Sequence, residues 1–338
     1  MKDRIFNKIK NLFAHKAIVL MYHRIAEPKS DVWETTVSPK RFEEHLQVLR
    51  KIGNVVSLRQ LANSISSKHL PGNNIAVTFD DGYIDNFTTA RPLLEKYGIP
   101  ATFFIASGNI ENKNEFWWDE LEFVILSAES LPEVFSLNIK GNPISYQLKN
   151  ESSLNDEIRQ QHNAWKACTE APPTTRAKLF YELWQHLKPL PYLEQQEYLQ
   201  IIRNWAAFPL TARPDYRTMA AAEIGQLASN SLFTIGAHTV THPALACYKV
   251  SYQKNELNEN RERLKEITNR EINLLAYPYG NYNEETLRIT SELGFYSAFT
   301  TEEKTLRSKS PMHCLGRFQV KNITGAELRD QLKLWRLQ

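Results

Sequence analysis

The chain has 338 residues, of which 42% are hydrophobic and 23% charged, a composition typical of a soluble globular protein with one large domain or two ordinary ones. Its 41 basic and 38 acidic residues give a formal net charge of +3, which argues against a nucleic-acid-binding protein. The three widely spaced cysteines form no CxxC pair, so they indicate free thiols in a reducing compartment rather than a disulfide framework.

The first 16 residues carry apolar side chains at helical spacing with basic residues between them. This pattern is typical of a helix lying on a membrane surface, or of a helix packed on its own domain. The segment has no clean apolar core and no small-residue cleavage site, so it is not predicted to be a secretory signal. We expect a cytoplasmic protein, with peripheral membrane contact through residues 1–16 as an open alternative.

Short apolar runs, separated in many places by amphipathic stretches, follow one another along the chain. The runs predict buried strands at 17–22, 75–79, 101–106, 232–237, 272–277 and 296–300, and the amphipathic stretches predict helices at 40–52, 85–97, 252–268 and 283–293. Alternation of strand and helix predicts an α/β fold with a largely parallel sheet. In such folds the reactive groups gather at the carboxyl ends of the strands.

The middle of the chain has a different character. From 110 to 216 the sequence is polar, helix-like and punctuated by prolines. We interpret it as a mostly helical insertion between two halves of one α/β domain. The predicted division is an N-terminal segment 1–16, a barrel domain formed by 17–109 and 217–338, and the insertion 110–216.

Two adjacent carboxylates, Asp80 and Asp81, end the second apolar run and precede Gly82. Like charges repel and each resists burial, so a nearby cation would remove the conflict. His238 and His242 follow another predicted strand, and residues four apart share one face of a helical turn. Two imidazoles and one carboxylate form the donor set of catalytic metal sites with open coordination positions. The alternative is a pair of capping or core histidines.

A proline–glycine turn, Pro278-Tyr279-Gly280, ends a further predicted strand. Proline and glycine fix the backbone, so the amide N–H of Tyr279 is a candidate donor to a developing oxyanion. An ordinary turn is the alternative.

Taken together, three motifs resemble the polysaccharide deacetylase family, carbohydrate esterase family 4, with its chitooligosaccharide deacetylase homology domain. They are "TFDDGY" (78–83), "HTVTHPAL" (238–245) and "AYPYG" (276–280), supported by "MYHRI" (21–25), "GIPATFFIA" (98–106) and "LGRFQV" (315–320). The resemblance covers about 17–109 and 217–320 and implies a distorted, incomplete (β/α) barrel of 7–8 strands. It also implies a divalent metal at the top face of that barrel.

The resemblance implies a separate role for each aspartate. Asp80 matches the catalytic base of the family, and the metal ligands match Asp81, His238 and His242. Zn²⁺ suits this donor set, and iron, cobalt and nickel tolerate the same ligands. The implied reaction is attack of metal-activated water on an N-acetyl carbonyl, with Asp80 accepting the proton and the Tyr279 N–H helping to stabilise the oxyanion.

The sequence departs from the family pattern at two places. Ala276 stands where many members carry an arginine that holds the base, and Arg317 is a candidate replacement as well as a candidate substrate-binding residue. His313 matches poorly the C-terminal histidine motif that supplies the general acid. His23, which resembles a histidine of biofilm poly-N-acetylglucosamine deacetylases, is the predicted alternative.

Three further residues carry weaker predictions. Trp117 and Trp118 open the insertion and are candidates for a substrate wall, because aromatic faces stack on sugars, with core packing as the alternative. Asp85 is the predicted N-cap of the helix after Asp81.

The sequence therefore predicts a metal-dependent hydrolase that removes an N-acetyl group from an amino sugar in a polysaccharide, an oligosaccharide or a precursor. Two alternatives remain open. One is a deacetylase of a nucleotide- or lipid-linked sugar or of a non-sugar amide. The other is a carbohydrate-binding module without catalytic activity.

Overall fold

A computed structural model describes residues 16–111, 114–208 and 212–337 of the chain. Nearly all of the predicted N-terminal segment 1–16 lies outside these residues. The chain divides into two compact units, which are described separately. In the described ranges, the first unit comprises 16–27, 35–111 and 218–337, and the second comprises 28–34, 114–208 and 212–217.

A parallel sheet forms the centre of the first unit. Its strands lie in the order β11-β10-β9-β6-β5-β1-β12, and β4 pairs with β5 beside this path. The strands are β1 (Ala17–Tyr22), β4 (Asn54–Val55), β5 (Asn74–Phe79), β6 (Ala101–Ile105), β9 (Phe233–Ala237), β10 (Leu274–Ala276), β11 (Ser297–Phe299) and β12 (Phe318–Gln319). The six predicted strands are confirmed. The two-residue strands β4 and β12 are too short to show a hydrophobic pattern.

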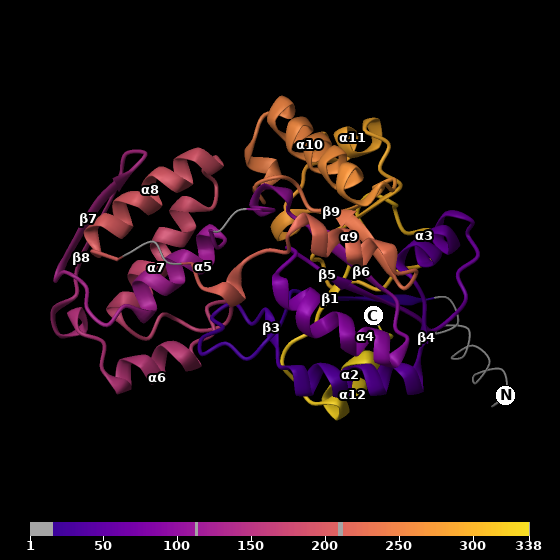
Figure 1. Cartoon of the computed structure of the whole chain (residues 1–338), viewed down its shortest axis with the longest axis horizontal. Helices are drawn as coiled ribbons and strands as arrows, with labels where there is room; N and C mark the ends of the chain where they lie inside the picture. Colours follow the sequence, from indigo (N-terminus) through magenta and orange to yellow (C-terminus); the bar gives the residue numbers. More distant parts are fainter. Residues whose placement is uncertain (1–15, 112–113, 209–211, 338) are drawn as a thin grey trace. The chain divides into compact units, whose positions relative to one another are not determined.

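Helices cover the sheet, as an α/β fold requires (Figure 1). They are α2 (Pro39–Ile52), α3 (Leu58–Ser66), α4 (Arg91–Tyr97), α9 (Ala221–Ser229), α10 (Val250–Thr268), α11 (Glu284–Glu292) and α12 (Gly325–Trp335), with a π-helical turn η1 (Asn86–Ala90) before α4. A short parallel pair, β2 (Arg24–Ile25) and β3 (Thr36–Val37), lies beside the main sheet. In the part of the chain that the structure describes, no helix is long and apolar enough to cross a bilayer.

The sheet curls into a half-barrel. A parallel bridge between Phe299 of β11 and Leu315 links one edge strand to the segment that leads into β12. The predicted α/β fold, a distorted (β/α) barrel with a mostly helical insertion, is confirmed.

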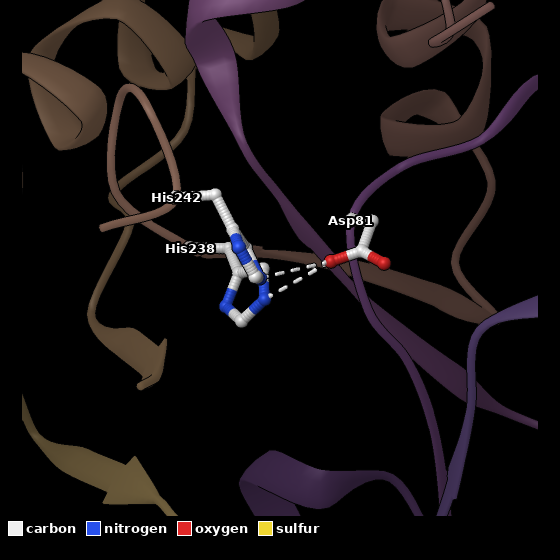
Figure 2. A group of neighbouring side chains, drawn as sticks. All are labelled: Asp81, His238 and His242. Carbon is white, nitrogen blue, oxygen red and sulfur yellow. Dashed lines mark ion pairs between the residues drawn. The ribbon is translucent and has the colours of Figure 1, made fainter. Parts of the chain in front are cut away.

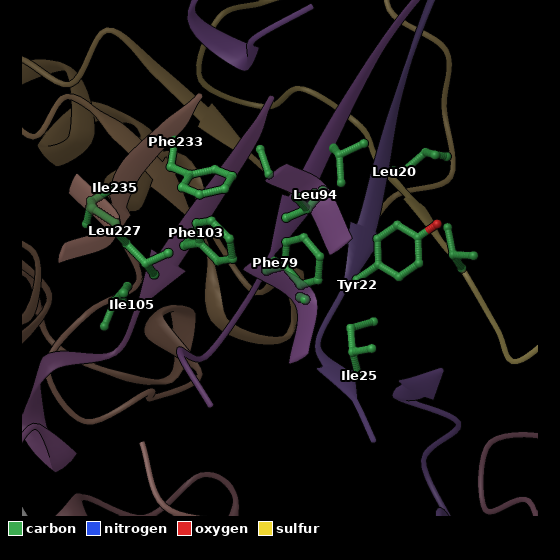
Figure 3. Close-up of a cluster of buried hydrophobic side chains, with 14 of the residues drawn as sticks. Leu20, Tyr22, Ile25, Phe79, Leu94, Phe103, Ile105, Leu227, Phe233 and Ile235 are labelled. Atoms are coloured by element: carbon green, nitrogen blue, oxygen red, sulfur yellow. The ribbon is translucent and has the colours of Figure 1, made fainter. Parts of the chain in front are cut away.

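Alternation along the strands sorts side chains between the two faces of the sheet. Tyr22, Phe79 and Phe103 occupy paired positions on β1, β5 and β6, and their rings lie in a row on the face packed with α2 and α4 (Figure 3). The ring centroids are 5.4 Å apart for Tyr22 and Phe79 and 5.0 Å apart for Phe79 and Phe103. Because successive side chains point to opposite faces, Thr78 and Asp80 lie on the other face, inside the barrel.

The second unit has its own apolar core. It contains α5 (Trp117–Glu122), α6 (Asp156–Ala164), α7 (Thr175–Leu187), α8 (Tyr192–Trp205) and an antiparallel hairpin of β7 (Val134–Ile139) and β8 (Asn142–Gln147). The sequence reading did not foresee this hairpin. Lys140 and Gly141 form its two-residue turn, and both have positive φ, as the commonest hairpin turns require.

Trp117 and Trp118, the predicted substrate wall, belong to this second unit. Trp117 is 3% exposed and part of the unit's core, and Trp118 is half-buried against the same core. The structure therefore gives Trp117 the environment of a core residue.

Candidate active site

Segments that follow four strands of the parallel sheet supply the residues of the site. Asp80 and Asp81 follow β5, His238 follows β9, Pro278 follows β10 and His23 follows β1. Because these strands are parallel, their carboxyl ends meet at one edge of the sheet.

One carboxylate oxygen of Asp81 faces both imidazoles (Figure 2). Its Oδ1 is 3.3 Å from Nε2 of His238 and 3.3 Å from Nε2 of His242, and all three residues are buried. An N–H···O hydrogen bond is normally shorter, about 2.9 Å. Two ligands held about 2.0–2.1 Å from a tetrahedral ion lie about 3.3 Å apart. The separations therefore fit three ligands of one metal ion.

The orientation of His238 also fits a metal ligand. Its Nδ1 lies 2.8 Å from the carbonyl oxygen of Ala276, which can only accept, so Nδ1 carries a proton. In the neutral ring the lone pair of Nε2 then faces Asp81. A lone pair and a carboxylate oxygen repel unless a cation lies between them. Imidazole ligands commonly donate their other N–H to a carbonyl in this way.

The ionisation of these groups shows how strongly the site favours positive charge. Burial raises the pKa of Asp81, but the adjacent imidazoles of His238 and His242 outweigh burial and hold that pKa well below its usual range. Burial lowers the pKa of His238, and the carboxylates of Asp81 and Asp80 more than reverse this effect. Burial of His242 outweighs the carboxylates and lowers its pKa, so of the two imidazoles only His238 is shifted toward its charged form.

The two histidines do not share a helical turn, so that prediction is wrong. Residues 238–242 form a loop in which Thr239 has φ +66° and His242 has φ +58°. Asp81 and Tyr279 have φ +72° and +58°. Each non-glycine residue in this left-handed region is strained, and such strain clusters at functional sites. The strained loop, rather than helix periodicity, brings both rings to Asp81.

Asp80 forms a two-point ion pair with Arg317. The guanidinium donates to Oδ1 and Oδ2 at 2.7 Å each, and it also contacts the Thr78 hydroxyl at 3.2 Å and the Thr300 carbonyl at 3.1 Å. Burial raises the pKa of Asp80, but Arg317 and the neighbouring histidines hold it below its ordinary value. Asp80 is thus kept as an anion.

Arg317 has 0% of its surface exposed. It is therefore placed to hold Asp80 and has no exposed surface with which to bind substrate. Its position matches the predicted replacement of the arginine that is absent at Ala276.

His23 directly follows β1, and Asp80 directly follows the adjacent strand β5, so the two residues lie side by side. Tyr22 pairs with Phe79, and the Tyr22 carbonyl accepts the Asp80 N–H at 3.0 Å. The charge of His23 lowers the pKa of both Asp80 and Asp81. Its Nδ1 is buried and has no hydrogen-bond partner among the described residues. His23 therefore lies near both carboxylates, and its role in the site stays a prediction.

His313 lies elsewhere. Its Nε2 contacts the carbonyl of Phe295 at 2.9 Å, before the start of β11 and thus at the opposite end of the sheet from the carboxylates. The structure does not bring His313 to the site, and so gives no support to His313 as the general acid.

Tyr279 lies in the turn η7 (Pro278–Gly280) beside one metal-ligand candidate. Its ring meets His242 edge-on, with centroids 4.5 Å apart. Gly280 has φ +63°, and an added Cβ would lie 2.1 Å from the Thr301 hydroxyl oxygen, so the turn requires glycine. The donor role of the Tyr279 N–H stays a prediction.

Asp85 occupies the predicted N-cap position, before η1, but its side chain makes no capping hydrogen bond. Its carboxylate accepts from Nε of Arg24 at 2.9 Å and from the backbone N–H of Ile25 at 2.9 Å. The next residue, Asn86, donates to the His23 carbonyl at 2.7 Å. These contacts fix the chain from the carbonyl of His23 to Ile25. Sequence reasoning missed them because the partners lie about 60 residues apart.

Comparison with known proteins links this geometry to one family. A family model described as polysaccharide deacetylase matches residues 67–132 and 203–298, which contain Asp80, Asp81, His238 and His242. YxkH of Bacillus subtilis (strain 168), whose name assigns it to the polysaccharide deacetylases, is 20% identical over 307 residues, 90% of this chain and 71% of its own length.

Two further proteins are informative. A poly-beta-1,6-N-acetyl-D-glucosamine N-deacetylase of Staphylococcus aureus is 23% identical over 138 residues, 37% of this chain, and the match takes in only 46% of that enzyme. The solved structure of a Streptococcus pyogenes deacetylase, PplD, in complex with acetate has a TM-score of 0.54 at 19% identity, covering 94% of this chain and 98% of PplD. This structural likeness shows a shared fold.

Proposed function

The chain belongs to the polysaccharide deacetylase family, and from this premise we propose that it is a metal-dependent hydrolase that removes an N-acetyl group from an amino sugar. The observation that carries the proposal is the pair of 3.3 Å separations between Asp81 and the two imidazoles, with an anionic Asp80 next in the sequence. Together they support a set of three metal ligands and a separate carboxylate that acts as the base.

We assign the metal ligands to Asp81, His238 and His242. Zinc is the first candidate, and iron, cobalt and nickel accept the same donors. The chemistry that such an ion supplies is Lewis acidity, which lowers the pKa of water toward neutrality and polarises a carbonyl oxygen.

Asp80 is the proposed general base. Its carboxylate accepts the proton of the attacking water, and a positioned base of this kind contributes about 10²–10⁴-fold to a rate. Arg317 keeps Asp80 ionised and fixes its direction through the two-point contact. Asp80 is therefore ready to accept a proton at neutral pH.

His23 is the proposed general acid. Collapse of the tetrahedral intermediate breaks the C–N bond, and the departing nitrogen needs a proton because an amide anion is a poor leaving group. The Tyr279 N–H is the proposed donor to the oxyanion. The products are acetate and a free amino group.

For the substrate, we propose an N-acetylated polysaccharide or oligosaccharide. The similarity to a poly-beta-1,6-N-acetyl-D-glucosamine N-deacetylase supports N-acetylglucosamine polymers as the first class to test. A cytoplasmic enzyme would instead meet nucleotide- or lipid-linked precursors. A binding module without catalysis is less consistent with the complete set of Asp80, Asp81, His238 and His242.

The test is acetate release by the purified chain from three substrate classes: N-acetylglucosamine oligomers, acetylated sugar nucleotides and lipid-linked acetylated sugars. We expect release from one class, loss of release after chelation and recovery on adding zinc. A chain that binds zinc and an oligomer but releases no acetate from any class would contradict the proposal and favour a binding module.

A further inference from the structure

Two buried polar side chains of α10 contact the loop that carries both imidazoles. Asn260 is 0% exposed and Glu256 is 6% exposed. They lie four residues apart, and so on the same face of the helix. Polar side chains are buried at this depth only where hydrogen bonds satisfy them.

Asn260 joins the ends of two strands. Its Oδ1 accepts the backbone N–H of His238 at 3.0 Å. Its Nδ2 donates to the carbonyl of Ile105, at the end of β6, at 2.9 Å, and to the carbonyl of Thr239 at 2.5 Å. One amide therefore fixes the backbone of the first imidazole residue relative to the neighbouring strand.

Glu256 binds the other half of the loop. One carboxylate oxygen accepts the N–H groups of Val240 and Thr241 at 2.8 Å each, and the other accepts the Thr241 hydroxyl at 2.6 Å. Within the loop, the Thr239 hydroxyl oxygen accepts the N–H of His242 at 3.1 Å. The backbone between the two imidazole residues is thus tied to α10.

This loop needs such support because it is strained. Thr239 and His242 both have left-handed backbones, and a strained conformation persists only when its surroundings determine it. Asn260 bonds to the first of these residues, and Glu256 bonds to the two residues between them. Without these bonds the loop is free to relax, and the imidazoles would leave the positions that face Asp81.

We propose that Glu256 and Asn260 are positioning residues that hold the loop 238–242 ready for the metal before it binds. The inference rests on the proposed function, because it takes Asp81, His238 and His242 as the ligands. Outer contacts that orient metal ligands are typically worth about 10–100-fold in metal affinity.

Gln253, one turn earlier on α10, provides a matched control. It is 0% exposed, and its side chain bonds to the Tyr248 carbonyl at 2.8 Å and the Thr286 hydroxyl at 2.6 Å, both outside the loop. A Gln253→Ala change therefore removes a buried polar anchor of the same helix without touching the loop.

The experiment is zinc affinity, measured by chelator competition on the full chain, with circular dichroism of the metal-free protein as the check on folding. We expect Glu256→Gln and Asn260→Ala to weaken zinc binding about 10–100-fold. Gln253→Ala should stay within about twofold of the wild type. Thr241→Val, which removes the hydroxyl donor to Glu256, is a milder variant, expected to weaken binding in the same direction if Asn260→Ala does not fold.

Equal affinity of Glu256→Gln, Thr241→Val and the wild type would overturn the inference, as would an equal loss in Gln253→Ala. Neither result would affect the proposed function. A wild-type chain that binds no zinc would overturn the proposed function and, with it, this inference.

Discussion

Two buried aspartate–arginine pairs lie close together in the first unit, and they differ in a useful way. Asp80 meets Arg317 through two contacts of 2.7 Å, whereas Asp85 meets Nε of Arg24 at 2.9 Å. All four side chains are at most 8% exposed. The two pairs thus have the same chemistry and nearly the same burial.

The pKa values of the two aspartates are shifted in opposite directions. Burial raises the pKa of both carboxyls, but at Asp80 the charges of Arg317 and the histidines outweigh burial and the pKa falls. At Asp85, Arg24 and the backbone N–H of Ile25 do not outweigh burial, and the pKa rises. The comparison supports the proposal that Asp80 is kept as an anion to act as the base, while Asp85 anchors the chain beside His23.

The largest expected effect is on turnover. Asp80→Asn should lower kcat by about 10²–10⁴-fold, because the base is removed, while zinc content stays at the wild-type level. Asp85→Asn, the matched control, should keep kcat within about tenfold. Acetate release and metal analysis on the same preparations measure both. Equal losses in the two variants would contradict the distinction between the pairs.

Replacing the arginine of each pair should have different effects on the pH dependence of kcat/KM. Arg317→Gln removes the charge that lowers the pKa of Asp80, so the acidic limb of kcat/KM should move to higher pH. At pH values below the pKa of Asp80, kcat/KM falls about tenfold for each unit by which that pKa is raised. Arg24→Gln should leave the limb in place. A pH–rate profile from pH 4 to 8 tests this. If the acidic limb of Arg317→Gln does not move, Arg317 does not control the pKa of Asp80.

A smaller effect on kcat is expected when His23, the proposed general acid, is replaced. His23→Gln should lower kcat about 10²-fold without loss of zinc, at the lower end of the range for general acid catalysis. Asn86→Ala should act in the same direction but less strongly, because it removes the 2.7 Å contact to the His23 carbonyl. Single-turnover acetate release is the appropriate measurement. Unchanged rates in His23→Gln would exclude His23 as the acid.

The smallest effect is on stability. The pKa of Asp85 is higher in the folded chain than in the unfolded one, so the folded state binds more protons. Its contribution is therefore present at low pH and lost as pH rises through the folded pKa. The free energy of unfolding lost in Asp85→Asn should be largest near pH 4 and shrink toward pH 7, by about 1.4 kcal/mol per unit of pKa difference. Urea unfolding from pH 4 to pH 7 measures this. A loss of unfolding free energy that grows with pH would contradict the prediction.

The parts of the fold that local patterns encode were predictable from the sequence. Continuous apolar runs identified the six main strands, because buried parallel strands are apolar on both faces. The hairpin β7–β8 was missed, since its residues lie in a stretch interpreted as helical. The four-residue spacing of His238 and His242 is typical of a helical turn, but two left-handed residues, Thr239 and His242, form a loop there instead.

The contacts of the site were less predictable than its residues. Asp80 and Arg317 are separated by 237 residues, and no local pattern indicates such a pair. Asn260 and Glu256 appear in the sequence as polar positions of an amphipathic helix, and only the fold shows that they face the loop 238–242. Long-range partners depend on how the strands are ordered in the sheet, which residue spacing alone does not determine.

The most direct measurement of the central claim is anomalous X-ray diffraction at the zinc absorption edge from crystals grown with zinc. We predict one strong peak about 2.0–2.2 Å from an oxygen of Asp81 and from Nε2 of both His238 and His242. Absence of a peak there, or an ion bound by other residues, would contradict the assignment on which the proposed deacetylase activity depends.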